Sequence, residues 1–133
     1  MAFQLGAVAR STMLDGFESA AGTTAKLLLR SGSVPANCGT ADAGTLLATL
    51  TLPSDWMQAG SAGAKLKSAA AWTGTVAVAG TAAHFRVWDN GLAVCHAQGT
   101  VGLGSGDLSL DNNVLGVGQT ITIGTFTLTA GNA

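Results

Sequence analysis

The chain has 133 residues, the length of one domain, and can bury a hydrophobic core without disulfides or metals. Only 10% of the residues are charged, against about a quarter in a typical soluble domain, and the net charge is −1. The six basic residues are scattered and balanced by seven acids, which excludes an electrostatic surface for nucleic acid. No apolar run approaches the length of a membrane-spanning helix, so no membrane partner is expected.

The scarcity of charge indicates a surface that partners cover, because interspersed charge normally keeps soluble monomers apart. The composition also leaves open a small extracellular β-domain whose exposed faces carry Thr, Ser and Gly. The first residues lack the basic stretch and continuous apolar segment of a signal peptide, so secretion by that route is not expected.

Residues 1–24 predict the one helix of the chain, ending at Gly22. Its apolar positions recur at spacings of three and four, and they are Leu5, Val8, Ala9, Met13, Phe17 and Ala21. A single helix ahead of a Gly- and Thr-rich remainder predicts either a lid across one end of a β-sandwich or an arm that docks on a neighbour.

Residues 25–133 predict a β-domain, because short segments with period-two alternation lie between Gly, Pro, Asn and Asp clusters. About eight strands are expected, at residues 26–30, 45–52, 65–71, 72–79, 82–89, 92–101, 107–111 and 119–129. No long helices alternate with these strands, so the expected fold is an all-β antiparallel sandwich, with a jelly roll as one candidate topology.

Three local features refine this prediction. Asn90-Gly91 favours a two-residue type I′ hairpin between the strands at residues 82–89 and 92–101. The apolar set of residues 119–129 moves from odd to even positions, which predicts a β-bulge near Gly124. Residues 54–65 predict a loop with one helical turn, capped by Ser54.

The loop at residues 31–44 is the first candidate contact surface, because long ordered loops are usually functional or bound to a partner. Aromatic and apolar side chains in other segments are candidate anchors of the same kind. The predicted interface residues are Leu5, Val8, Met13, Phe17, Val34, Pro35, Trp56, Met57 and Trp88.

The supply of titratable groups is thin for an enzyme, with two His and no Tyr. Cys95 and His96 are neighbours on a strand and are expected to point to opposite faces, which is unsuitable for a nucleophile and its base. His84 and His96 could meet across the hairpin, but two His without further ligands fall short of a zinc site. No catalytic, metal or cofactor-binding residues are predicted.

Other polar and aromatic clusters have structural interpretations that are favoured over functional ones. Asp107 and Asp111, with the Asn pair that follows, match no established calcium loop and favour turns. The Gly-rich stretch 102–106 does not open a helix, so it is read as a connector rather than a phosphate site. Trp56, Trp72 and Trp88 (three in all) are read as core or interface anchors, with a sugar-binding platform as the alternative.

Cys38 and Cys95 lie 57 positions apart, and spacing alone does not establish a bridge between them. Reduced thiols are the expected state, because no signal peptide directs the chain to an oxidising compartment.

The order of segments resembles that of small structural proteins of tailed bacteriophages. The resemblance lies in a helix beginning MAF and in LLLRSGSVPA, GTLLATLTLP, GTAAHFRVWD, LSLDN and GQTITIGTFTLTAG, which together span nearly the whole chain. It implies a virion component, assembled in the bacterial cytoplasm, without catalytic residues. A capsid decoration or cement protein that contacts the major capsid protein is the first expectation. A tail- or fibre-attached protein is the second.

Overall fold

The computed structural model describes residues 3–130, in which one helix precedes eleven strands. The elements are α1 (Ala7–Ala21), β1 (Lys26–Arg30), β2 (Leu46–Thr51), β3 (Ala64–Leu66), β4 (Trp72–Thr75), β5 (Gly80–Thr81), β6 (His84–Trp88), β7 (Cys95–Leu103), β8 (Leu108–Leu110), β9 (Val114–Leu115), β10 (Thr120–Ile123) and β11 (Thr127–Thr129). α1 ends at Gly22 as predicted, and the all-β fold with one N-terminal helix is confirmed.

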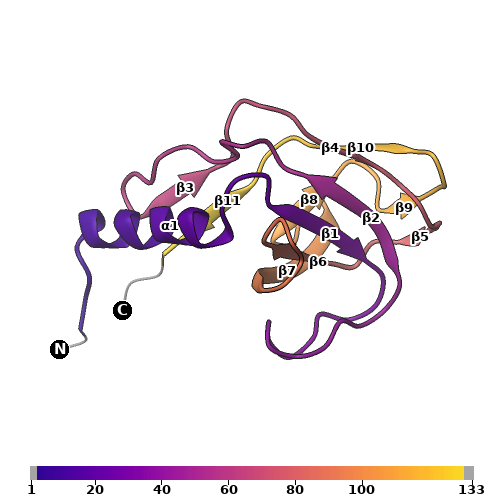
Figure 1. The fold of residues 1–133 in the computed structure, drawn as a ribbon, viewed down its shortest axis with the longest axis horizontal. Coiled ribbons are helices and arrows are strands. Elements are labelled where there is room, and N and C mark those ends of the chain that lie inside the picture. Colours follow the sequence, from indigo (N-terminus) through magenta and orange to yellow (C-terminus); the bar gives the residue numbers. More distant parts are fainter. Residues whose placement is uncertain (1–2, 131–133) are drawn as a thin grey trace.

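The largest sheet has five strands in the order β2-β1-β6-β7-β8. The three pairs β3–β11, β4–β10 and β5–β9 are antiparallel two-stranded sheets. An isolated bridge between Ala48 and Val76 joins the end of β4 to β2, so the β-structure curls over on itself. In Figure 1, α1 lies beside β3 and β11 at one end of the molecule, and β5 and β9 lie at the other.

The core lies between the five-stranded sheet and the short strand pairs that curl over it. β1 and β6 supply Leu27, Leu29, Phe85 and Val87 to this core, each at most 2% exposed. The period-two alternation of the strand predicted at residues 82–89 thus places its odd-numbered side chains in the core. A row of aromatic rings crosses the core with centroid separations of 5.5–5.8 Å, in the order Phe17, Trp56, Trp72, Phe126 and Phe85.

A bulge in β2 explains the one apolar residue that breaks the alternation of that strand. The pairing of β1 with β2 runs from Leu29 opposite Ala48 directly to Arg30 opposite Leu46. Leu47 is therefore the extra residue, and the local bend directs it into the core, where it is 1% exposed.

The predicted type I′ hairpin is wrong in its turn, although the antiparallel pairing of β6 with β7 is as expected. The connection is longer: Asp89 N–H donates to the Val94 carbonyl, and Leu92, not Asn90 or Gly91, has a positive φ of 57°. The Asp89 carboxylate accepts hydrogen bonds from the Ala93 and Val94 amides, which stabilises the wider loop.

The predicted strand at residues 119–129 is divided in two, so no bulge forms inside a continuous strand. β10 pairs with β4 and β11 pairs with β3, and the chain changes partner at residues 124–126. The change of partner accounts for the phase shift, because it allows Ile121, Ile123 and Phe126 all to reach the core.

Two further expectations need correction. No helical turn forms at residues 54–65, where Met57 instead bridges to Lys67 and Trp56 enters the core. β7 and β8 pair in parallel across a connection of four residues, 104–107, in which Gly104 and Gly106 adopt positive φ. Parallel neighbours normally need a dozen or more connecting residues, and this tight return depends on those two glycines.

Within residues 3–130, no helix has the length and apolar character needed to cross a membrane.

Candidate functional site

α1 is attached to the rest of the chain through polar side chains on one face. Ser11, Asp15 and Glu18 occupy positions i, i+4 and i+7, so they share that face. Ser11 Oγ accepts a hydrogen bond from Gly63 N–H at 3.0 Å, and Glu18 Oε2 accepts one from Met57 N–H at 3.1 Å. Backbone N–H groups of residues 57–63 thus hold the helix in place.

Lys65 on β3 lies at the centre of this attachment. Its ammonium group is 2.6 Å from Asp15 Oδ1 and 3.0 Å from Glu18 Oε1, and its side chain is 1% exposed. Burial alone would lower the pKa of Lys65, but the hydrogen bonds to both acids outweigh it and raise the pKa. The hydrogen bond from Lys65, with a second one from Gly60 N–H, lowers the pKa of Asp15.

Gly60 allows the helix to approach this closely. A Cβ atom at residue 60 would lie 2.6 Å from the Ser11 carbonyl oxygen, which is backbone and cannot rotate away. In the sequence, the only indication of this close contact is the pair Gly60 and Gly63. Glycines are common in any loop, so the pair does not by itself predict a contact with the helix.

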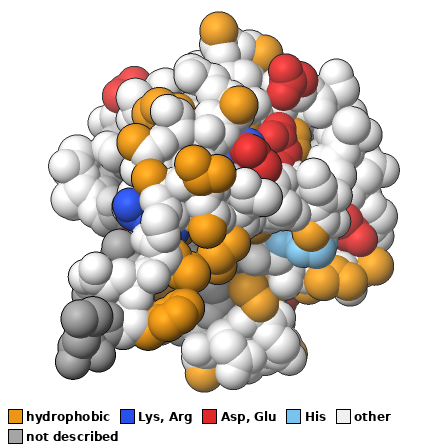
Figure 2. All heavy atoms as spheres, turned by 90° about the vertical axis from the view of Figure 1, so that its left-hand side faces the viewer, with side chains coloured by type: hydrophobic (Ala, Val, Ile, Leu, Met, Phe, Trp, Pro, Cys, Tyr) orange, Lys and Arg blue, Asp and Glu red, His pale blue; other side chains and the backbone are white. Residues whose placement is uncertain are grey.

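Three large apolar side chains on and just before α1 are exposed. Val8 is 82% exposed and Met13 is 59% exposed, and Phe3, just before the helix, is 82% exposed. Phe17, by contrast, points inward and meets Trp56 edge-on. Figure 2 views this end of the molecule and shows hydrophobic side chains spread over the face, with Asp and Glu side chains in its upper half and at its right edge. We call Phe3, Val8 and Met13 the outer helix patch.

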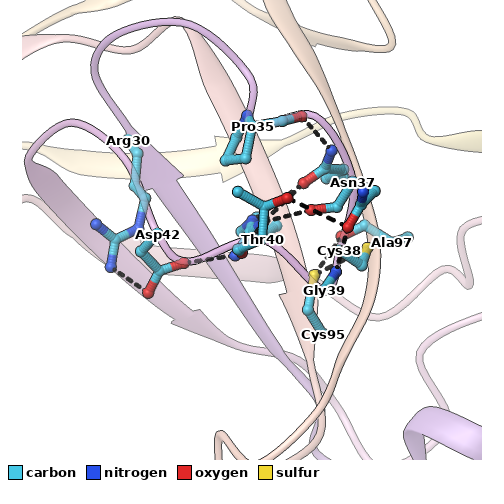
Figure 3. Close-up of polar contacts among 11 residues, drawn as sticks. Arg30, Pro35, Asn37, Cys38, Gly39, Thr40, Asp42, Cys95 and Ala97 are labelled. Carbon is cyan, nitrogen blue, oxygen red and sulfur yellow. Dashed lines mark hydrogen bonds and ion pairs between the residues drawn. The ribbon is translucent and has the colours of Figure 1, made fainter.

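The loop at residues 31–44 covers the outer face of the five-stranded sheet, next to β1 and β6 (Figure 3). Its anchor is Arg86 of β6, whose side chain is completely buried. Arg86 Nη1 is 2.8 Å from Asp42 Oδ1, and Nη2 donates to the carbonyls of Asn37 at 3.0 Å and Thr40 at 2.8 Å. Gln98 Oε1 accepts from the same guanidinium.

All three nitrogens of this buried guanidinium donate to an acceptor within the chain. Asp42 neutralises Arg86 and also pairs with Arg30 at 3.0 Å. The Arg86 guanidinium carbon lies 5.8 Å from the centre of the Trp88 ring, the next side chain on the same face of β6. A buried cation with these partners positions a loop.

Cys38 of this loop and Cys95 at the start of β7 are neighbours in space. Their Sγ atoms are 3.0 Å apart, both residues are half-buried, and both are free thiols. Burial, together with the hydrogen bond to Cys38, raises the pKa of Cys95 to about 12. An open pocket of about 410 Å³ reaches both cysteines and is also lined by Thr40, Asp42 and Trp88.

The predicted interface residues fall into three groups. Val8 and Met13 are exposed, whereas Leu5, Phe17, Val34 and Trp88 are half-buried. Trp56, Met57 and Pro35 are buried within the chain itself, where a partner would not reach them without a rearrangement. The first two belong to the aromatic core, and Pro35 lies under its own loop, where its carbonyl accepts from the Gln98 amide at 2.7 Å.

Sequence analysis missed other exposed apolar side chains. Leu92 and Val94, about half exposed, lie at the β6–β7 connection. At the β5–β9 end of the molecule, Val78, Val114 and Val117 are 43–71% exposed. Val114 and Val117 follow an Asn and a Gly in short segments without periodicity, so their sequence offered no signal of exposure.

The described residues do not bring together the groups needed for the alternative catalytic, metal or sugar-binding sites. His84 is fully buried with Nδ1 2.8 Å from the Gly32 carbonyl, and among residues 3–130 no recorded hydrogen bond joins an imidazole to a carboxylate. The described residues contain no group of three or more His, Cys, Asp or Glu suited to a metal. Trp56 and Trp72 are buried, so the three Trp do not form a sugar platform.

The Asp and Asn side chains near β8 are used within the chain. Asp107 Oδ2 accepts hydrogen bonds from the Thr100 amide and hydroxyl, and Asn112 Oδ1 accepts from Val114 N–H. The Asn112 contact is a local turn of the predicted kind, whereas the Asp107 contacts join the end of β7 to the start of β8.

Comparison with known proteins gives no matching family model, no matching curated protein and no matching solved structure.

Proposed function

We propose that this chain is a structural component of a tailed-phage virion, a capsid decoration protein that covers contacts between shell subunits and associates with further copies of itself. The observation that carries the proposal is the outer helix patch. Exposed apolar side chains, on and beside a helix that ion pairs to the buried Lys65 hold in place, are suited to contact with a protein partner.

The way in which α1 is attached supports this role. Ser11, Asp15 and Glu18 hold one face of α1 against residues 57–65, so the helix cannot rotate freely about its axis. Val8 and Met13 are therefore presented outward at a fixed orientation, which reduces the ordering entropy lost on binding.

The low charge of the chain and its resemblance to small phage structural proteins favour a virion over other assemblies. The major capsid protein is the partner we propose, and attachment to the tail or fibres is the alternative location. The half-buried Trp88 is the only one of the three Trp with surface in reach of a ligand, so a carbohydrate-binding role has little geometric support.

The test uses purified particles of the phage that encodes the chain. Mass spectrometry of these particles is expected to detect it at many copies per particle, and labelled chain is expected to rebind to particles that lack it. Absence of the chain from purified particles would overturn the proposal, and label confined to the tail would replace the capsid by the tail.

A matched pair of variants tests the surface. Val8→Asp with Met13→Asp is expected to reduce rebinding at least about tenfold, because two charges would be buried in an apolar contact. Val117→Asp, at the other end of the molecule where residue 117 is 71% exposed, is the control and is expected to rebind normally. Equal rebinding by both variants would exclude the outer helix patch as the contact.

A further inference from the structure

Cys38 and Cys95 bring two thiols together at the junction between the loop 31–44 and the sheet. The Cys95 thiol donates to the Cys38 sulfur across 3.0 Å, although 57 residues separate them in the chain. We propose that this pair is a disulfide-forming site, oxidised by a low-molecular-weight disulfide such as glutathione disulfide, and that the bond fastens the loop to β7.

The position of Cys38 does not depend on its sulfur. The carbonyls on either side of it, those of Asn37 and Thr40, both accept hydrogen bonds from Arg86 Nη2. Asn37 Oδ1 also accepts from Gly39 N–H at 2.9 Å and from the Thr40 hydroxyl at 3.2 Å (Figure 3). The reduced chain therefore already holds the loop close to the arrangement that the bond needs.

Cys95 is held from the other side by the sheet. It lies opposite Trp88, at the register shift in the pairing of β6 with β7, and its thiol also contacts the Ala97 carbonyl at 3.4 Å. A disulfide has a sulfur–sulfur length of about 2.05 Å, so bond formation requires an approach of only about 1 Å. The pocket lined by both cysteines gives the oxidant access.

The reaction proceeds by two thiol–disulfide exchanges. The Cys38 thiolate attacks one sulfur of glutathione disulfide and releases the first glutathione thiol. Cys95 then loses its proton, attacks the Cys38 sulfur and releases the second. The two cysteines lose two electrons and two protons, and glutathione disulfide gains them. Because the pKa of Cys95 is raised, the second exchange is slow at neutral pH and faster in alkali.

The test uses the full chain, reduced and then equilibrated in glutathione buffers of defined ratio. Alkylation and mass spectrometry are expected to show loss of both thiols with a mass decrease of two hydrogens, and peptide mapping is expected to join Cys38 to Cys95. Closing this loop is expected to raise the thermal midpoint by roughly 10 °C. Thiols that stay fully alkylatable in excess glutathione disulfide, or that stop at the glutathione adduct or at a disulfide-linked dimer, would overturn the proposal.

A second variant tests the positioning of Cys38. Asn37→Ala removes the acceptor that serves Gly39 and Thr40, and is expected to lower the oxidised-to-reduced ratio about fivefold at a fixed glutathione ratio. Asn90→Ala is the control, because its side chain bonds only to Thr24. An unchanged ratio in Asn37→Ala would show that the loop does not position the thiol. Cys38→Ser is expected to abolish the shift in thermal midpoint on oxidation.

Discussion

Lys65 carries its charge at a position that solvent does not reach, and it owes that position to two acids of α1. A buried cation that loses its partners is costly, whereas acids with partial exposure can be solvated by water. Asp15 and Glu18 have side-chain exposures of 47% and 21%, against 1% for Lys65. The cost of breaking the group should therefore depend on which partner is removed.

Lys65→Met is expected to lower the free energy of unfolding by about 1–3 kcal/mol, because the methionine fills the site and the two acids rehydrate. The double variant Asp15→Asn, Glu18→Gln leaves the ammonium group buried without an anion, and it should lose about twice as much. Urea unfolding followed by tryptophan fluorescence measures both. A larger loss in Lys65→Met would contradict this account of the buried charge.

The same residues predict the dependence of stability on pH. The pKa of Asp15 is lowered, so its contribution is present above the ordinary value of 3.8 and is lost as pH falls below it. The pKa of Lys65 is raised, so its contribution is present below the ordinary value of 10.5 and is lost as pH rises through the higher folded value. Urea midpoints should show these losses at both extremes in the native chain, and smaller ones in Lys65→Met.

At the scale of elements, the loop 31–44 depends on a guanidinium that forms several bonds at once. Arg86→Lys keeps the charge, but a single ammonium cannot reach Asp42, Gln98 and the two loop carbonyls together. We expect a loss of about 3 kcal/mol in stability and faster amide exchange at Gly39 and Thr40, measured by urea unfolding and hydrogen exchange.

Arg30→Lys is the matched control for that prediction. Arg30 pairs with the same Asp42, but its side chain is 12% exposed and contacts one acid oxygen. Its replacement should cost less than about 1 kcal/mol. Equal effects of the two substitutions would mean that the loop is not anchored by Arg86.

The strands were largely predictable because alternation is a local signal. Residues 82–89 placed Phe85 and Val87 on one face, as the structure has them. The sequence could not indicate that the opposite face, with His84 and Arg86, is covered by a loop 46 residues away from Arg86 at Thr40. The attachment of the helix was unpredictable for the same reason, since the ion pair of Lys65 with Asp15 spans 50 residues.

At the scale of the whole molecule, the helix and the β-domain share one core. Phe17 continues the aromatic row to Trp56, and Trp56 Nε1 donates to the Gly22 carbonyl at 2.9 Å. A chain that begins at residue 25 would expose Trp56 and leave Lys65 without its acids. We therefore expect residues 1–24 and 25–133 to unfold together.

The truncated chain is expected to lose more than about 4 kcal/mol and to lack the near-ultraviolet circular dichroism of a packed core. Val8→Ser with Met13→Ser is the control, because it alters only the exposed side of α1 and should stay within about 0.5 kcal/mol per site. A truncated chain that unfolds cooperatively at the native midpoint would show that the helix is an independent arm.

The distribution of charge in the chain bears on the rate at which it associates with a partner. Each of the six Lys and Arg side chains has a recorded partner within the chain: Arg10 with the Ala130 carbonyl, Lys26 with Thr51, Arg30 and Arg86 with Asp42, Lys65 with Asp15 and Glu18, and Lys67 with the carbonyls of Ser68 and Ala70. Because only 10% of the residues are charged and the net charge is −1, encounters with a partner receive little long-range steering. Association should proceed at the unsteered rate of about 10⁵–10⁶ M⁻¹s⁻¹ and change little with ionic strength, so the local concentration of binding sites, rather than attraction at a distance, would set the speed of assembly.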